Sequence, residues 1–159
     1  TWTTQQVYQE KTLLQADTIL NDKVYQDLAN EEELYAYKKK MARELRLLVE
    51  WEVLLHQILD CTQRFPKRVR FSFGHRIDTM VLDCTQTIVK AQYAPHSDQS
   101  IYLVTLNQQL AQLRLLLRIS ADRKYLSLGQ LRVLIEGLEG IGYQVHAWLG
   151  GLHSGKTSL

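Results

Sequence analysis

The feature that most constrains the fold is a long stretch, Glu31–Cys61, that contains neither glycine nor proline. Asn30 and the acidic run Glu31–Glu33 stand at its start, where a capping side chain and negative charge suit the positive end of a helix dipole. Its apolar side chains recur at steps of three and four residues: Leu34, Tyr37, Met41, Leu45, Leu48, Trp51, Leu55, Ile58 and Leu59. The pattern predicts one amphipathic helix of roughly 45 Å, at about 1.5 Å per residue.

The same periodicity predicts three further helices. The second is expected from a capping Ser72 to about Tyr93, with the apolar stripe Ile77, Met80, Val81, Cys84, Ile88 and Ala91. After a loop around Pro95, the third runs from about Ser100 to Ala121, with one face formed by Leu103, Leu106, Leu110, Leu113, Leu117 and Ser120. The fourth follows a capping Ser127, and Gly150–Gly151 should end it after about Leu149.

The fourth segment contains four glycines: Gly129, Gly137, Gly140 and Gly142. Each costs about 1 kcal/mol relative to Ala in a helix interior. Small residues let another backbone approach closely, so this composition favours tight packing, either within a bundle or across a subunit contact.

Four helices with short connections predict an all-α fold, an up-down-up-down four-helix bundle over residues 31–150. Residues 1–30 hold two short helical patterns that would not be stable alone. They are expected to form an N-terminal helical extension, and residues 151–159 a flexible tail. A length of 159 residues, 45% of them hydrophobic, suits one globular domain with a real core.

The charge is unevenly distributed along the chain, although the formal net charge is only +2. Residues 1–60 hold seven Lys and Arg against eleven Asp and Glu, whereas residues 61–159 hold twelve against six. The basic second part is therefore the better candidate for binding nucleic acid or an acidic protein. The lysines Lys38–Lys40 are interpreted as a solvated helix face.

The sequence shows no catalytic or metal-binding pattern, so we expect no catalytic residues, no metal and no cofactor. The histidines lack the spacing of a metal site, and no nucleophile elbow, Walker loop or carboxylate pair occurs. Cys61 and Cys84 lie in apolar helical contexts, where buried free thiols are expected. Without a signal peptide or an apolar run near 18 residues, the chain is expected to be soluble and cytoplasmic.

The connection between the first two helices, Phe65–Phe71, alternates large apolar groups with positive charge. Pro66 lacks a backbone donor and should stop the first helix. Phe65, Phe71 and Phe73 are interpreted mainly as core plugs at the end of the bundle, and stacking on unpaired bases is the alternative.

Several basic residues could form an anion-binding surface: Lys67, Arg68, Arg70, Arg76, Lys90, Arg114, Arg118, Arg123 and Lys124. Such residues on one surface would bind RNA or DNA in a salt-dependent, largely sequence-independent way. Arg114 and Arg118 are four residues apart and share a helix face. A paired or interface role and a ligand role are equally compatible with this spacing.

Two sets of motifs resemble one known family. The first half contains Leu59-Asp60, Phe65-Pro66-Lys67-Arg68-Val69-Arg70-Phe71, Gly74, Arg76-Ile77-Asp78 and Ala91-Gln92-Tyr93. The second contains Leu113-Arg114-Leu115-Leu116-Leu117-Arg118, Lys124-Tyr125-Leu126-Ser127, Ile141-Gly142 and Trp148-Leu149-Gly150. Over about residues 34–150 the chain resembles the Avd proteins, the accessory variability determinants of diversity-generating retroelements. These are sisters of the four-helix proteins encoded in 23S ribosomal RNA intervening sequences, and the second set of motifs favours the Avd branch.

The resemblance implies a four-helix protomer that assembles into a homopentameric barrel with a positively charged surface. Such a barrel binds the retroelement reverse transcriptase and its template RNA, with cDNA as a further ligand, and enables mutagenic cDNA synthesis at adenines. It has no catalytic residues of its own. The positions matched by motif for the basic surface are Lys67, Arg68, Arg70, Arg76, Arg114 and Arg118. Residues 1–30 have no counterpart in the pattern.

Two alternatives remain at this point. One is an intervening-sequence-type bundle, a structural and RNA-binding protein without a polymerase partner. The other is a ribonuclease resembling the HEPN family, whose R-x4-H motif would be Arg70 and His75.

Overall fold

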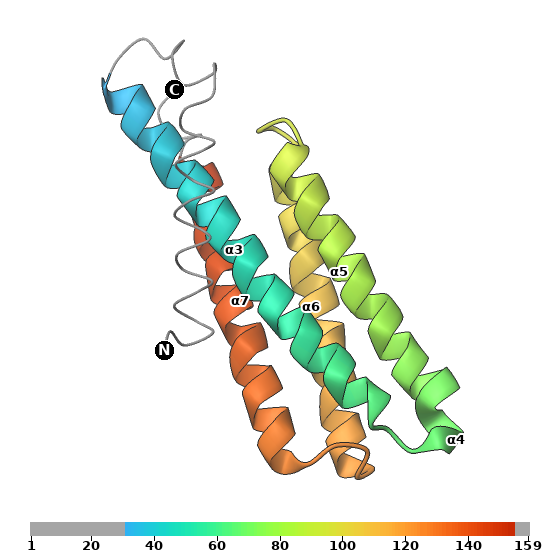
Figure 1. Cartoon of the computed structure of the whole chain (residues 1–159). Helices are drawn as coiled ribbons and strands as arrows, with labels where there is room; N and C mark the ends of the chain where they lie inside the picture. The colour runs from blue at the N-terminus through green and yellow to red at the C-terminus, as the bar shows by residue number, and fades with distance from the viewer. Residues whose placement is uncertain (1–30, 155–159) are drawn as a thin grey trace. The chain divides into compact units, whose positions relative to one another are not determined.

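A computed structural model describes residues 31–154, and all regular structure in this range is helical. Its elements are α3 (Glu31–Gln63), α4 (Lys67–Val69), the π-helical turn η1 (Arg70–Gly74), α5 (His75–Tyr93), α6 (Gln99–Asp122) and α7 (Leu128–Ser154) (Figure 1). The all-α prediction is confirmed for these residues. The predictions for the extension 1–30, for the cap Asn30 and for residues 155–159 lie outside the described residues.

The chain divides into two units, one up to Glu50 and one from Trp51 onward, and each is described by itself. In the first unit, α3 begins with the acidic turn Glu31–Glu33, as predicted. Lys40 Nζ lies 4.0 Å from Glu44 Oε1, and burial of Glu44 raises the pKa of its carboxyl. Lys39 Nζ lies 5.3 Å from the centroid of the exposed Tyr35 ring.

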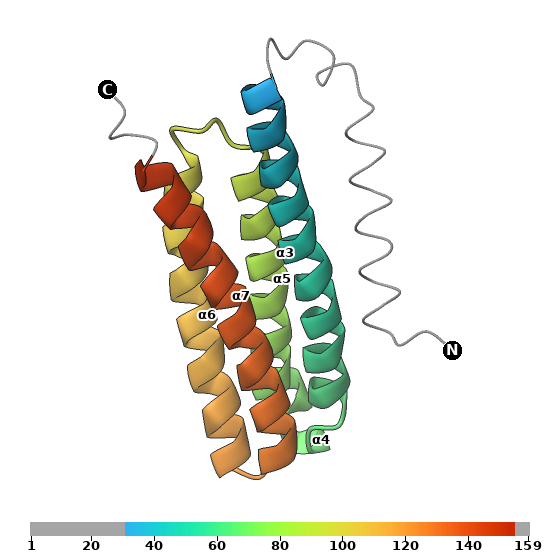
Figure 2. The same ribbon diagram turned by 90° about the vertical axis from the view of Figure 1, so that its left-hand side faces the viewer.

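The second unit contains the end of α3 together with α5, α6 and α7, which run alternately up and down (Figures 1 and 2). Helix α6 packs against both α5 and α7. Trp51 Nε1 of α3 donates a hydrogen bond to Thr85 Oγ1 of α5 at 2.8 Å, and Leu54 of α3 lies against Gly137 of α7. The four helices therefore enclose one core as a helical bundle.

The apolar stripes predicted for α5 and α6 form this core. The stripe predicted for α3 is only partly right: Trp51 and Ile58 are buried, but Leu55 and Leu59 are half-buried, and the core takes Leu54 instead. On α5, Ile77, Val81, Cys84, Ile88 and Ala91 are fully buried. On α6, Leu103, Leu106, Leu110, Leu113, Leu117 and Ser120 are fully buried too. The buried free thiol expected at Cys84 is confirmed, whereas Cys61 is half-buried.

The start of α7 confirms a predicted cap. Gln130 N–H donates to Ser127 Oγ at 3.1 Å, and Ser127 N–H donates to Gln130 Oε1 at 2.9 Å. This reciprocal pair is a capping box, which satisfies two backbone donors that a helix start leaves without partners. The loop predicted around Pro95 is confirmed as well, between the end of α5 at Tyr93 and the start of α6 at Gln99.

Two predicted helix ends are wrong. Ser72 does not cap the second helix: it lies inside η1, and its hydroxyl donates to the Val69 carbonyl behind it at 3.4 Å. The helical backbone already begins at Lys67, directly after Pro66. Gly150–Gly151 does not end the fourth helix, since α7 continues to Ser154 and buries Leu152. An apolar contact beyond the glycines outweighs their weak helix propensity.

The close approach predicted from the glycines is confirmed at Gly137. A Cβ atom there would lie 2.7 Å from Leu54 Cδ1, closer than non-bonded carbon atoms approach. At Gly140 and Gly142 a Cβ would meet nothing within 4 Å. These two glycines therefore do not serve packing among the described residues.

Candidate nucleic-acid interface

An aromatic cluster holds the end of the bundle where α3 stops and α4 begins. Phe65 follows α3 and is 1% exposed. Its ring centroid lies 5.6 Å from that of Tyr125, which comes from the connection between α6 and α7, and Phe73 of η1 meets Tyr125 edge-on at 5.8 Å. The interpretation of Phe65 as a core plug is confirmed. The same interpretation is wrong for Phe71, which is 84% exposed.

Helix α6 turns into this cluster through a left-handed residue. Tyr125 N–H donates to the Ser120 carbonyl at 2.8 Å, and Lys124 N–H donates to the Ala121 carbonyl at 2.9 Å. This is a Schellman motif in which Lys124, at φ 63°, occupies the position that usually holds glycine. A side chain in this conformation costs about 1 kcal/mol, and it places an exposed lysine beside the buried Tyr125.

Two arginines lie over the ring of Tyr125. Arg68 Cζ of α4 is 6.0 Å from the ring centroid, and Arg123 Cζ, at the end of α6, is 5.9 Å from it. Arg123 Nε also donates to the Tyr125 hydroxyl at 3.0 Å. This hydrogen bond raises the pKa of Arg123. Tyr125 thus joins positive charge from two connections at one end of the bundle.

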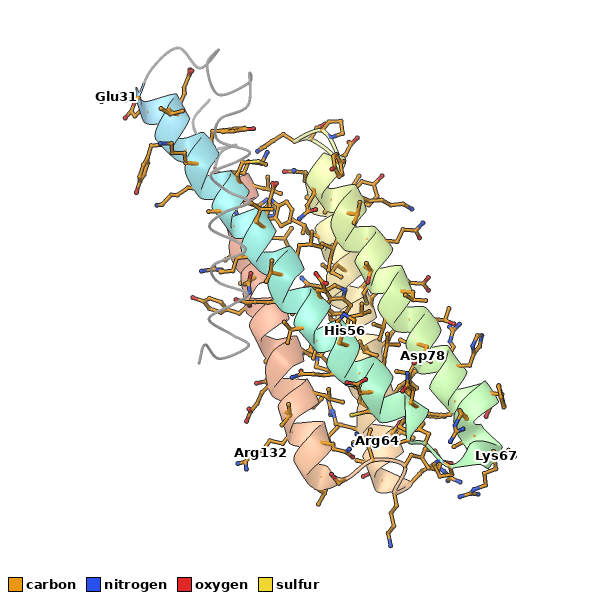
Figure 3. All side chains as sticks on the ribbon, in the orientation of Figure 1. Glu31, His56, Arg64, Lys67, Asp78 and Arg132 are labelled. Atoms are coloured by element: carbon orange, nitrogen blue, oxygen red, sulfur yellow. The ribbon has the colours of Figure 1, made fainter. Side chains whose placement is uncertain are left out.

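Four of the six predicted binding residues lie within one short stretch at this end. Lys67 and Arg68 are on α4, Arg70 is on η1, and Arg76 is in the first turn of α5; all four are exposed. Figure 3 labels Arg64 where the chain leaves α3 and Lys67 across the connection, at the start of α4. No acidic residue occurs between Arg64 and Arg76, and none of these five cations forms an ion pair with another residue of the described chain.

These four residues differ in what they already contact. Arg70 Nη2 donates to the Phe65 carbonyl at 3.3 Å and so ties η1 to the end of α3. Arg68 lies against Tyr125. Lys67 and Arg76 make no side-chain hydrogen bond to another described residue, which leaves their charges available to an outside partner.

The other two predicted residues lie on α6, apart from the stretch that follows α3. Arg114 is half-buried, and its Nε donates to the Leu110 carbonyl of its own helix at 3.4 Å. Arg118 is exposed, one turn before the end of α6. Among the described residues, neither one forms a side-chain hydrogen bond or an ion pair with α4 or η1.

Sequence reasoning missed Tyr125 as the residue that joins the two connections. The apolar periodicity of the sequence gave no signal for Tyr125, because this residue lies between α6 and α7 and belongs to the apolar stripe of neither helix. The available signal was its place after Arg123-Lys124, in a stretch with the same mixture of cations and aromatic rings as Phe65–Phe71.

The R-x4-H pair of the ribonuclease alternative lies in and directly after the π-turn, with Arg70 as the first residue of η1 and His75 as the first of α5. The Arg70 guanidinium donates a hydrogen bond to the Phe65 carbonyl. His75 N–H donates to the Arg70 carbonyl, and this backbone hydrogen bond closes the π-turn. Within residues 31–154, no group of three or more His, Cys, Asp or Glu side chains could hold a metal ion. Over the same residues, no helix is long and apolar enough to span a bilayer.

The fold and this end of the molecule together define a small helical-bundle protein with a basic, aromatic-bearing connection. The family model described as bAvd-like matches residues 38–152. This range covers most of the chain and includes all six predicted binding residues, so the chain belongs to the bAvd-like family. The resemblance inferred from the motifs is thereby confirmed. A search of curated proteins found no match to the chain.

Proposed function

We propose that this protein is the non-enzymatic accessory subunit of an error-prone reverse transcriptase in a diversity-generating retroelement. It binds the reverse transcriptase and the template RNA, and with them it enables mutagenic cDNA synthesis. The observation that carries the proposal is membership of the bAvd-like family over residues 38–152. A protein with this role acts where the template RNA is made, which agrees with the cytoplasmic location expected from the sequence.

The basic end of the bundle supports an anionic partner. Lys67, Arg68 and Arg76 are exposed on a stretch without acidic residues. Each phosphate that such a side chain neutralises releases counterions, so affinity for RNA falls as salt is added. Contacts to phosphate carry no sequence information, so this surface would bind RNA largely independently of its sequence.

The exposed apolar side chains of two helices support the homopentameric barrel implied by the family. On α6, Ile101, Val104 and Leu115 are 62%, 49% and 55% exposed, at the spacing of one helix face. On α5, Leu82 and Val89 are seven residues apart and 57% and 40% exposed. We propose that these faces contact neighbouring copies of the chain, since a helix with apolar side chains on two sides needs two partners.

The test uses the full chain, purified alone and co-expressed with the reverse transcriptase encoded beside it. We expect salt-sensitive binding of structured RNA, co-purification with the polymerase, and a mass of five protomers by light scattering. Failure to bind RNA together with failure to associate with the polymerase would overturn the proposal. The neighbouring genes decide between this function and the intervening-sequence alternative: a reverse transcriptase with template and variable repeats, or a ribosomal RNA operon.

A further inference from the structure

Phe71 is an exposed aromatic ring on the π-turn η1. It is 84% exposed, and no other aromatic ring of the described chain stacks on it. Exposure of one apolar side chain is ordinary. Phe71 differs because of the backbone that carries it and the charges that surround it.

The backbone beneath Phe71 is fixed from the inside. Phe71 and Phe73 are two residues apart in a helical turn, so their side chains leave it on opposite sides. Phe73 meets Tyr125, Gly74 lies against Phe65, and Arg70 bonds to the Phe65 carbonyl. Turning Phe71 inward would break these contacts. The ring is therefore held outward on a rigid base, and little backbone freedom is lost when it meets a ligand.

The π-turn also sets the position of Phe71 relative to the cations. His75 N–H donates to the Arg70 carbonyl, a five-residue step that inserts one residue between α4 and α5. Lys67 and Arg68 precede Phe71 by four and three residues, about one turn, and Arg76 follows it by about one π-turn. The ring therefore stands between positive charges on both sides along the helical path.

This mixture favours one class of partner. An apolar protein surface that covered Phe71 would also have to desolvate the cations beside it, which is costly without matching acids. In single-stranded RNA, phosphates and bare base faces occur at each nucleotide, so phosphates can pair with cations while a base covers the ring. In duplex RNA the base faces are already stacked, and only the phosphates are available.

We propose that η1 presents Phe71 as a stacking platform for an unpaired base of RNA, with Lys67, Arg68 and Arg76 on the flanking phosphates. This inference rests on the RNA binding of the proposed function and adds that the bound stretch is single-stranded. Phe71 acts by contact with the base, and the cations act by charge.

The test measures dissociation constants of the full chain for two labelled probes: a short RNA of mixed sequence without internal pairing, and a duplex RNA of the same length. The variants are Phe71→Ala, which removes the ring, and Phe71→Trp, which enlarges it. The matched control is Tyr143→Ala. Tyr143 is also highly exposed (78%), but it lies on α7 with Glu139 four residues before it.

We expect Phe71→Ala to bind the single-stranded probe about 5- to 150-fold more weakly, the range for loss of one stacked base. Its affinity for the duplex, its thermal midpoint and the salt dependence of binding should be unchanged. Phe71→Trp should bind the single-stranded probe at least as well as the parent, and Tyr143→Ala should match the parent for both probes.

Equal affinity of Phe71→Ala and the parent for the single-stranded probe would overturn the inference while leaving the proposed function intact. Loss of affinity for both probes alike would overturn it too, because stacking cannot act on the duplex. If Phe71→Ala keeps its RNA affinity but loses the reverse transcriptase or changes its mass in solution, the ring is a protein contact and the inference is wrong. A parent that binds neither probe would overturn this inference. The proposed function would fall with it only if the chain also failed to associate with the reverse transcriptase, which is measured separately.

Discussion

Tyr125 shows how one residue can be structural and still shape a binding surface. Two aromatic contacts and a hydrogen bond hold it at the end of the bundle, and each aromatic pair is worth about 0.5–1.5 kcal/mol beyond the burial of its surface. Its ring also positions Arg68 and Arg123 from two different connections. Arg68 therefore contributes to the stability of the fold through its contact with Tyr125. Within the described chain, Arg76 lacks such a contact.

The buried thiol of Cys84 predicts how stability depends on pH. Burial raises its pKa from 9.0 to about 12. Between these pH values the folded chain retains a proton that the unfolded chain has lost, so the unfolding free energy decreases as pH rises from about 9 to about 12. We expect the unfolding free energy, measured by urea unfolding over this pH range, to fall more steeply for the parent than for Cys84→Ala. Lysines and tyrosines titrate alike in both proteins, so their effect cancels in the comparison. If the unfolding free energies of the two proteins changed equally with pH, the raised pKa of Cys84 would be contradicted.

At the scale of the helix, the glycines of α7 differ in whether a neighbouring side chain occupies the space beside them. Gly137 permits the approach of α3, because Leu54 occupies the space where a Cβ would lie. Gly140 has open space beside it and still pays the weak helix propensity of glycine. Nothing in the described chain accounts for Gly140, and the subunit contact considered from the sequence stays a prediction for it.

Alanine variants at the two positions distinguish the glycine that packing requires from the glycine that it does not. Gly140→Ala should stabilise the chain by about 1 kcal/mol from helix propensity alone. Gly137→Ala gains the same propensity but overpacks Leu54, at a cost of about 1–3 kcal/mol, so it should be the less stable variant by that difference. Urea unfolding gives both values. If the two variants were equally stable, Leu54 would not be confined as the structure shows. A reduced mass of Gly140→Ala in light scattering would place that glycine in a contact between copies.

For the whole molecule, charge and aromatic rings gather at the bundle end where α3 meets α4 and α6 meets α7. The two connections are about sixty residues apart in sequence, so neither alone forms this surface. Antiparallel packing brings them together, and Tyr125 fixes their register. Of the six predicted residues, four lie in the connection after α3 or at the start of α5, whereas Arg114 and Arg118 lie on α6, within three turns of its end.

Charge removal should distinguish the free cations from the anchored one. Arg76→Ala is expected to weaken RNA binding and to reduce the salt slope by about 0.7–0.9, the value for one phosphate contact, without changing the thermal midpoint. Arg68→Ala should weaken RNA binding similarly and also lower stability by about 0.5–1 kcal/mol, because it loses the contact with Tyr125. Helicity should be unchanged in both. The control is Lys39→Ala, in the lysine run of α3 interpreted as a solvated face, which should bind like the parent. A large loss of stability in Arg76→Ala would show that this arginine is structural.

Much of the fold was predictable because the helices are long and strongly periodic. Periodicity and local interactions within a few residues are displayed directly by a sequence. They predicted the core positions of α5 and α6, the cap at Ser127 and the stop at Pro66. Two of the errors concern the bounds of helices. Ser72 looked like a cap because its hydroxyl can bond nearby backbone, and the structure uses that hydroxyl backward, toward Val69, inside a turn of unusual period.

The basic residues of the candidate site were visible in the sequence, but their roles were not. Phe65, Phe71 and Phe73 look alike in composition, yet one is buried, one is exposed and one meets Tyr125 edge-on. The inserted residue of η1 decides which ring faces inward, and no local propensity signals a π-turn at Arg70–Gly74.

The sequence by itself determined that the chain is helical, which faces of its helices are apolar, where its positive charge lies, and which family it resembles. These properties follow from spacing and composition along the chain. Only the tertiary structure decided that Arg68, Arg123, Phe65 and Phe73 share Tyr125, that Leu54 fills the space beside Gly137, and that Phe71 faces solvent. Each of these depends on packing between segments far apart in sequence, where the position of one side chain is set by the volume and charge of its neighbours in space.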